Sequence, residues 1–183
     1  GKTHNGKSIP RDGAKIGDCL YVSGVLGLSK IGLDNFNSNF KEFYEAKRKY
    51  LLPQPRVDLG ISLKNIANSM IDISDGLSSE LLHISKSSKV SVKIYEDKIP
   101  IDYTVMNKAA ELNLNPIFCA LNGGEDYELL FTIDQKEYSK LEKDPDFTII
   151  GHVTDKSEGN FFISNDNQAH ELTAQGWDSL KSS

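Results

Sequence analysis

The sequence has little cysteine, no long apolar run and no excess of basic residues, and each absence excludes a class of protein. Cys19 and Cys119 are the only cysteines and form no CxxC pair, so we expect two reduced core thiols rather than a disulfide. No apolar stretch approaches the roughly 20 residues that span a bilayer, and the polar start lacks the apolar stretch of a signal peptide. We therefore expect a cytoplasmic protein without a membrane partner.

The charge and the length of the chain exclude further classes of protein. Lys and Arg number 21 against 26 Asp and Glu, a net charge of −5, which makes nucleic acid an unexpected partner. With 38% hydrophobic and 26% charged residues, the 183-residue chain has the composition of an ordinary folded domain. The first residue is Gly rather than Met, and no helix or strand pattern begins there, which suggests a piece of a longer protein.

Helix and strand patterns interleave along the chain. Strands are predicted at residues 19–23, 69–74, 90–95, 148–153 and 160–164, with a dense apolar run at 127–133. Helices are predicted at about 38–50, 59–68, from 76 onward, and 103–112. The helix at 38–50 ends in the basic cluster Lys47-Arg48-Lys49, whose positive charges we interpret as stabilising the negative end of the helix dipole. This interleaving predicts an α/β or α+β domain with a mixed β-sheet layered with helices.

The segment Ile71–Leu77 is the most informative. Its two isoleucines face one way, whereas Asp72 and Ser74 face the other, so a carboxylate is predicted inside a core strand, at a cost that a cation must offset. Asp75 occupies an N-cap position, and Gly76 lets the backbone turn there. A structural interpretation has Asp75 capping the helix and Asp72 pairing with a surface lysine. A functional one is a site for Mg²⁺ and phosphate, because carboxylates beside a helix N-terminus suit both.

A second acidic segment runs from Asn122 to Glu128. Its paired glycines, Gly123 and Gly124, permit positive φ and close approach of a ligand to the backbone. Taken alone, the segment is typical of a turn with solvated acids. Beside the first acidic segment, it becomes a candidate part of the same site.

These residues resemble the C-terminal part of the thiamine-monophosphate kinase family, within the aminoimidazole-ribotide-synthetase-like superfamily. The matching blocks occur in the family's order: 11–18, 22–29, 53–56, 71–77, 82–84, 121–129 and the pair 176–177. The most specific of them are DISDGL and, at the right distance, GGEDYEL.

The resemblance implies an ATP-dependent, Mg²⁺-assisted transfer of a phosphoryl group onto thiamine monophosphate, giving thiamine diphosphate. The protein groups of such a kinase mainly position and neutralise the reactants. By their places in the motifs, Asp72 and Asp75 match Mg²⁺ ligands, and Ser74 matches an ATP contact. Arg11 resembles the family's ATP-binding arginine.

On the substrate side, Glu125 matches a substrate contact and Trp177 an aromatic position that holds the thiamine part. A cationic ring would suit both an acid and an aromatic face. The chain departs from the family after Trp177, where Asp178-Ser179-Leu180 stands in place of a His-Phe pair.

The resemblance also implies a domain organisation. Residues 1–183 match one C-terminal domain, whereas the family's N-terminal ATP-binding and dimerisation domain is absent from this chain. We therefore expect a homodimeric full-length enzyme and an inactive isolated chain. Two alternatives stay open: another ATP-using member of the superfamily (selenophosphate synthetase, ribotide synthetase or hydrogenase-maturation type), or a non-catalytic binding module.

Overall fold

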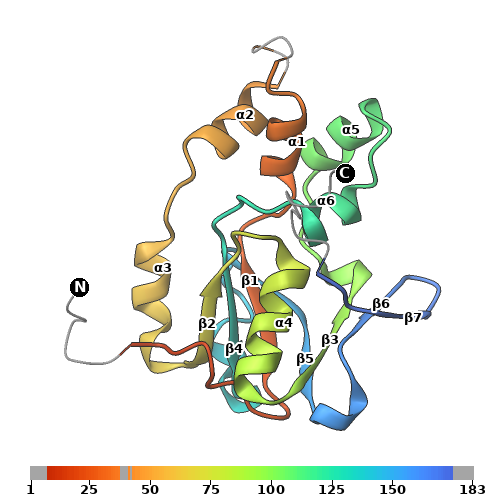
Figure 1. Cartoon of the computed structure of the whole chain (residues 1–183). Coiled ribbons are helices and arrows are strands. Elements are labelled where there is room, and N and C mark those ends of the chain that lie inside the picture. Colours follow the sequence, from red (N-terminus) through yellow and green to blue (C-terminus); the bar gives the residue numbers. More distant parts are fainter. Residues whose placement is uncertain (1–7, 38–40, 42, 175–183) are drawn as a thin grey trace, which may run out of the picture.

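A computed structural model of the chain describes residues 8–37, 41 and 43–174 (Figure 1). The strands are β1 (Cys19–Ser23), β2 (Ala67–Asp72), β3 (Ser91–Tyr95), β4 (Leu129–Ile133), β5 (Phe147–Thr154), β6 (Phe161–Ile163) and β7 (Ala169–Glu171). The α-helices are α1 (Leu28–Asp34), α2 (Tyr44–Leu51), α3 (Val57–Ser62), α4 (Leu77–Ser88), α5 (Tyr103–Glu111) and α6 (Pro116–Asn122). Short 3₁₀ helices are η2 (Leu63–Asn65), η3 (Glu96–Lys98), η4 (Gln135–Lys140) and η5 (Lys156–Glu158).

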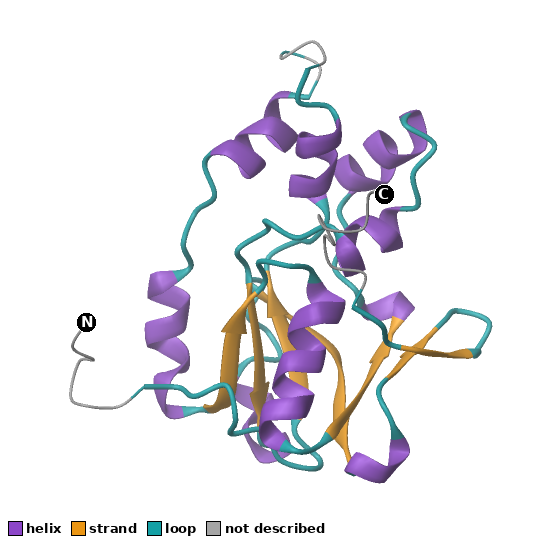
Figure 2. Cartoon of the chain, viewed as in Figure 1, coloured by secondary structure: helices purple, strands orange, loops and turns teal. Residues whose placement is uncertain are grey.

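The strands form one seven-stranded mixed sheet in the order β2-β4-β1-β5-β3-β6-β7 (Figure 2). β1 pairs antiparallel with both β4 and β5, and β2 pairs antiparallel with β4. β3 pairs antiparallel with β5 but parallel with β6, which in turn pairs antiparallel with β7. The predicted fold class, a mixed sheet layered with helices, is confirmed.

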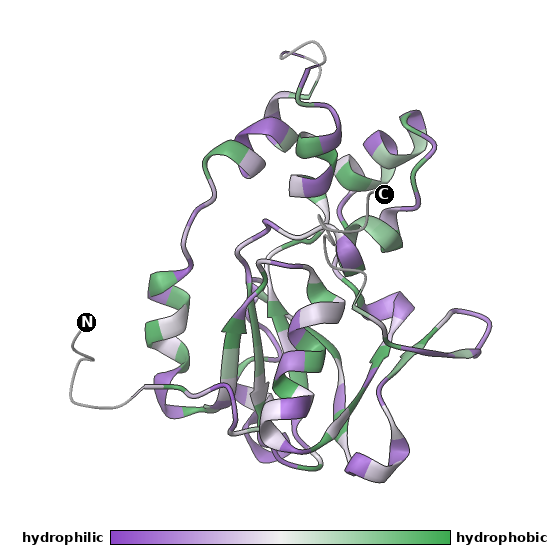
Figure 3. Cartoon of the chain, viewed as in Figure 1, coloured by the Kyte–Doolittle hydropathy of each residue, from purple (hydrophilic) through white to green (hydrophobic). Residues whose placement is uncertain are grey.

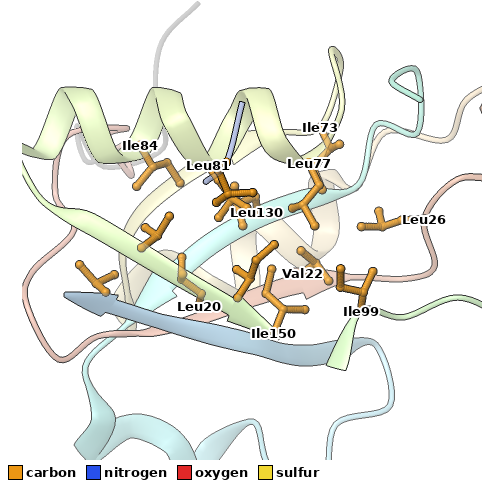
Figure 4. Close-up of a cluster of buried hydrophobic side chains, with 14 of the residues drawn as sticks. Leu20, Val22, Leu26, Ile73, Leu77, Leu81, Ile84, Ile99, Leu130 and Ile150 are labelled. Atoms are coloured by element: carbon orange, nitrogen blue, oxygen red, sulfur yellow. The ribbon is translucent and has the colours of Figure 1, made fainter. Parts of the chain in front are cut away.

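The central strand β1 is buried on both faces of the sheet. All five of its residues are buried, because successive side chains point to opposite faces and each face is covered. Leu20 and Val22 face α4, which contributes Leu77, Leu81 and Ile84 to the same cluster (Figure 4). Figure 3 shows the hydrophobic residues concentrated along these central strands.

The other face of the sheet carries aromatic packing. The rings of Tyr21 and Phe131 stack with centroids 5.6 Å apart, and Phe147 meets Phe131 edge-on at 5.2 Å. Leu63 of η2 and Leu141, just after η4, complete this second cluster.

A third, smaller core joins the helices at one end of the sheet. In Figure 1, α1, α2, α5 and α6 gather beyond the ends of β2 and β4. Their contact is built from Ile31, Phe43, Ala46, Val105 and Cys119 among others. Cys119, like Cys19, is buried and free, as expected.

The helix predicted at 59–68 is wrong in its bounds. α3 ends at Ser62, one 3₁₀ turn follows, and β2 begins at Ala67. The apolar spacing that suggested one helix is real, because Leu59, Leu63 and Ile66 all pack in the second cluster, but α3 and the 3₁₀ turn η2 bring them there. The sequence patterns did not predict α6 and β7.

No helix within the described ranges is long and apolar enough to cross a membrane.

The close packing of α1 on α2 gives a first prediction. A methyl group at Gly32 would lie 2.2 Å from the carbonyl oxygen of Ala46, whereas at Gly60 in α3 the nearest atoms are 4.0 Å away. Gly32→Ala should lower the free energy of unfolding by about 2 kcal/mol, because the helices must move apart. Gly60→Ala, the matched control, should raise it by up to about 1 kcal/mol through helix propensity. Urea unfolding of both variants checks this; equal effects would contradict the close contact.

Candidate functional site

The acidic turn, residues 72–75, links the end of β2 to the start of α4. β2 is an edge strand of the sheet, and the side chains of Asp72 and Asp75 are exposed. The prediction that Asp72 lies inside a core strand is therefore wrong, since an edge position leaves its carboxylate in solvent at little cost. No ion pair of either aspartate is present in the described part of the chain, so the surface-lysine interpretation is not supported.

Asp75 does not cap α4. The N-cap is Gly76, with φ of 108°, and it makes no side-chain cap bond. Glu80, in the first turn of the helix, instead holds the segment just before it, because its Oε1 accepts from the backbone N of Asp75 (3.3 Å) and the Oγ of Ser74 (3.5 Å). Burial raises the pKa of Glu80, and the charges of Asp75 and Asp72 act in the same direction. The side chains of the two aspartates are thus left available to a ligand.

The acidic loop, residues 122–128, is hydrogen-bonded to the acidic turn. The backbone N of Glu125 donates to the carbonyl oxygen of Ser74 (2.7 Å), and that of Tyr127 donates to Ile73 (2.9 Å). The N of Ile73 in turn donates to the carbonyl oxygen of Glu128 (2.8 Å). The structure therefore brings Asp72, Ser74, Asp75 and Glu125 together, although the two segments lie far apart in sequence.

Side chains of the acidic loop alternate between the interior and the surface. Asp126 and Glu128 have no exposed surface, whereas Glu125 and Tyr127 are half-buried. The interpretation of this segment as a turn with solvated acids is thus wrong for two of its acids. Asp126 Oδ2 accepts from the backbone N of Gly27 (2.7 Å), which anchors the loop at the start of α1. Burial raises the pKa of Asp126 to about 6.

Glu128 is the most heavily bonded carboxylate of the site. It accepts from Ser23 Oγ (2.6 Å), Lys49 Nζ (2.5 Å), and Arg56 through Nε (2.8 Å) and Nη2 (2.7 Å). Burial alone would raise its pKa, but these hydrogen bonds hold the pKa of Glu128 below its ordinary value. Lys49 therefore has a more specific partner than the helix dipole proposed from sequence.

Two pockets flank the acidic turn and the acidic loop. One of about 370 Å³ has Asp75 and Glu125 in its wall, together with Lys30, Tyr50 and Ser74. The other, of about 460 Å³, has Asp72 and Tyr127 in a wall that is otherwise largely apolar and includes Pro53, Pro55 and Arg56. The two segments thus form a ridge that presents carboxylates to a pocket on each side.

The donor set limits what kind of metal site this chain can form. Within residues 8–37, 41 and 43–174, no group of three or more His, Cys, Asp or Glu side chains could hold a metal. Asp72 and Asp75 are two hard oxygen donors at one turn, and Mg²⁺ is commonly bound by one or two carboxylates plus phosphate oxygens and waters. The residues therefore fit a metal that arrives with a phosphorylated ligand, rather than a protein-only cage.

One predicted site residue that the structure describes, Arg11, is not brought to this cluster. The carbonyl oxygen of Arg11 accepts from the Oγ of Ser88, the last residue of α4, whereas Asp75 precedes the first (Figure 1). Helix α4 has 12 residues, so its two ends lie about 18 Å apart along the helix axis. Trp177 lies outside the described residues. The sequence reasoning missed Lys49, Arg56 and Tyr127, although Arg56 and Tyr127 lie within the blocks that match the family.

A family of known proteins matches most of the chain. The family model described as "AIR synthase related protein, C-terminal domain" matches residues 15–164, which include both acidic segments. The chain belongs to this family.

Several curated relatives of this chain are named thiamine-monophosphate kinase. Thiamine-monophosphate kinase of Buchnera aphidicola subsp. Schizaphis graminum is 42% identical over 169 residues, covering 86% of the chain and 51% of the relative. The solved structure of AaThiL complexed with AMPPCP and TMP is similar with a TM-score of 0.80 at 33% identity, over 92% of this chain and 53% of that one. E. coli HypE, a hydrogenase maturation protein, has a TM-score of 0.67 at 17% identity, over 93% of this chain and 54% of that one, which shows the fold alone. The chain spans about half the length of the curated relatives it matches.

The buried carboxyl group of Asp126 should make the free energy of unfolding of this AIR synthase related domain depend on pH. Because its pKa rises from 3.8 to about 6 on folding, the stabilisation of the protonated form is present below pH 4 and is lost as the pH rises to 6. Asp126→Asn cannot ionise, so its stability relative to the wild type should improve by up to about 3 kcal/mol between pH 4 and pH 7. Urea unfolding at both pH values measures this; a difference that does not change with pH would refute the raised pKa.

Proposed function

We propose that this chain is the C-terminal part of an ATP-dependent thiamine-monophosphate kinase. In the reaction, an oxygen of the thiamine monophosphate phosphate attacks the γ-phosphorus of ATP. The bond from that phosphorus to the β,γ-bridging oxygen breaks, giving thiamine diphosphate and ADP. Catalysis of this kind depends on positioning and charge neutralisation.

One observation carries the proposal: backbone hydrogen bonds fasten the acidic loop to the acidic turn, the N of Glu125 to the carbonyl oxygen of Ser74 among them. This contact places a candidate substrate residue beside two candidate metal ligands, Asp72 and Asp75. The similarity to curated kinases and to the AaThiL complex with AMPPCP and TMP supports the same assignment.

The proposed role of each site residue follows from the chemistry of its side chain. Asp72 and Asp75 would hold Mg²⁺, whose chemistry when bound is to neutralise the phosphate oxygens that the carboxylates would otherwise repel. Ser74 would contact ATP through its hydroxyl. Glu125 would attract the cationic part of thiamine monophosphate, and Trp177 would cover it with an aromatic face.

We expect the rest of the site to come from the half of the relatives' length that this chain does not match. We propose that an N-terminal domain supplies most of the ATP site and a homodimer interface, and that Arg11 contacts ATP once that domain is in place. The proposed setting is the cytoplasm, with small molecules as the partners.

The alternatives have weaker support. The likeness to HypE is confined to the fold, so it carries no activity. A non-catalytic module cannot be argued against from a buried Asp72, because that residue is exposed. It is disfavoured instead by the 42% identity to a curated kinase over 86% of the chain.

The proposal predicts that Asp75→Asn, made in the product of the complete open reading frame, lowers turnover at least a hundredfold. Its melting temperature should stay within a few degrees, because removing one of several neighbouring carboxylates relieves repulsion. Production of thiamine diphosphate from thiamine monophosphate and Mg-ATP, followed by chromatography, is the measurement.

Asp97→Asn is the matched control, since Asp97 is an exposed aspartate in η3, which follows β3, and three strands separate β3 from β2 in the sheet. Its turnover should equal that of the wild type. A wild-type protein that forms no thiamine diphosphate, or an Asp75→Asn variant with normal turnover, would reject the proposal.

A further inference from the structure

Arg56, just before α3, has a guanidinium group that is only partly used. Its Nε and Nη2 donate to the carboxylate of Glu128 at 2.8 Å and 2.7 Å, along one edge of the group. Nη1, on the other edge, makes no hydrogen bond or ion pair within residues 8–37, 41 and 43–174. Because a guanidinium has more N–H donors than one bidentate carboxylate engages, this outer edge is available to a second acceptor.

Glu128 does not need both of its cations. Lys49 Nζ lies 2.5 Å from Glu128 Oε1, and its charge alone balances that of the buried carboxylate. Arg56 is a second cation on the same group, and 36% of its side chain is exposed, against 16% for Lys49. The hydrogen bond to Glu128 is the largest cause of a raised Arg56 pKa, and the charge of Asp146 contributes. Asp146 is exposed, however, and no ion pair joins it to Arg56 in the described part of the chain.

Arg56 lines the pocket of about 460 Å³ beside the acidic turn. Asp72 lines the same pocket, yet no ion pair between Asp72 and Arg56 is present in the ranges that the structure describes. Since most of the remaining wall is apolar, these few polar groups would orient a ligand there. A cation and a carboxylate that share a pocket without pairing can both engage a phosphoryl group, the arginine directly and the carboxylate through Mg²⁺.

We propose that Arg56 is a phosphate-binding residue: the outer edge of its guanidinium donates to a phosphoryl group in this pocket, while Glu128 holds the other edge. The planar guanidinium matches the geometry of phosphate oxygens, and the bidentate contact with Glu128 fixes its orientation before the ligand binds. The inference rests on the proposed function for the source of the phosphoryl group, which is thiamine monophosphate or ATP.

Kinetics of the product of the complete open reading frame distinguish these two sources. Arg56→Gln should raise the KM for thiamine monophosphate or that for ATP at least about tenfold, as for a lost hydrogen bond to a charged group. The KM that rises identifies the phosphate that Arg56 binds. The inhibition constant of the corresponding compound without phosphate, thiamine or adenosine, should change less than about twofold. Unchanged KM values for both substrates, or equal weakening of the phosphorylated and unphosphorylated compounds, would overturn the proposal.

Two further variants separate phosphate binding from support of Glu128. Lys49→Gln removes the other cation of this carboxylate, but the described residues that line the pocket do not include Lys49. It should therefore affect the phosphorylated and unphosphorylated compounds equally, within about twofold, and a selective loss like that of Arg56→Gln would overturn the proposal. Arg48→Gln, at an exposed arginine in α2, is the matched control and should leave both KM values unchanged.

Arg56→Lys keeps the test available if Arg56→Gln does not fold. The lysine retains a positive charge beside Glu128 but lacks the second edge of the guanidinium, so the same KM should rise at least about threefold. An Arg56→Lys protein with the KM values of the wild type would overturn the proposal.

A binding measurement separates the phosphate site from the proposed function. Inorganic pyrophosphate, titrated with Mg²⁺ into the same protein by calorimetry, should bind the wild type at least about fivefold more tightly than Arg56→Gln. No binding to the wild type, or equal affinity for the two proteins, would overturn the phosphate site. A wild-type protein that is inactive on thiamine monophosphate but shows this difference would reject the proposed function, while the phosphate site would stand.

Discussion

One buried carboxylate, that of Glu128, holds the site together. It has no exposed surface and accepts hydrogen bonds from β1, from α2 and from Arg56 just before α3. A buried charge is tolerated only when it is paired and fully hydrogen-bonded, so these segments cannot move apart without exposing an uncompensated charge. The helical end of the molecule, through Lys49, is thereby fixed to the sheet at the place where the acidic loop begins β4.

The acidic residues of the two segments therefore fall into two groups. Asp126 and Glu128 use their hydrogen-bonding capacity inside the protein. The carboxylates of Asp72, Asp75 and Glu125 are at least partly exposed, and we propose that a ligand binds them. Along residues 125–128 the side chains alternate between partly exposed and buried, which produces this split. Backbone hydrogen bonds join this segment to the acidic turn just before α4. The exposed carboxylates can lie close together because Mg²⁺ and phosphorylated ligands, rather than protein cations, are their proposed partners.

Much of this could be predicted from the sequence, for identifiable reasons. The Gly17-Asp18 turn before Cys19–Ser23 and the apolar spacing after Gly76 are local patterns, and they predicted the central strand and α4 correctly. The exposure of Asp72 depends on β2 lying at the sheet edge, which is a matter of topology and not of local pattern. The partners of Glu128 could not be predicted either, because its pairing with Lys49 and Arg56 spans 79 and 72 residues. The roles assigned to Arg11 and Trp177 stay predictions.

The most direct test of this account is native-state amide hydrogen exchange in Glu128→Gln. If Glu128 fastens the acidic loop, the backbone N–H groups of Glu125 and Tyr127 should exchange at least about tenfold faster than in the wild type. Glu158→Gln removes an exposed carboxylate paired with Lys93, and it should leave both amides unchanged. Protection of Glu125 and Tyr127 that is the same in Glu128→Gln as in the wild type would contradict the central role given to this buried carboxylate.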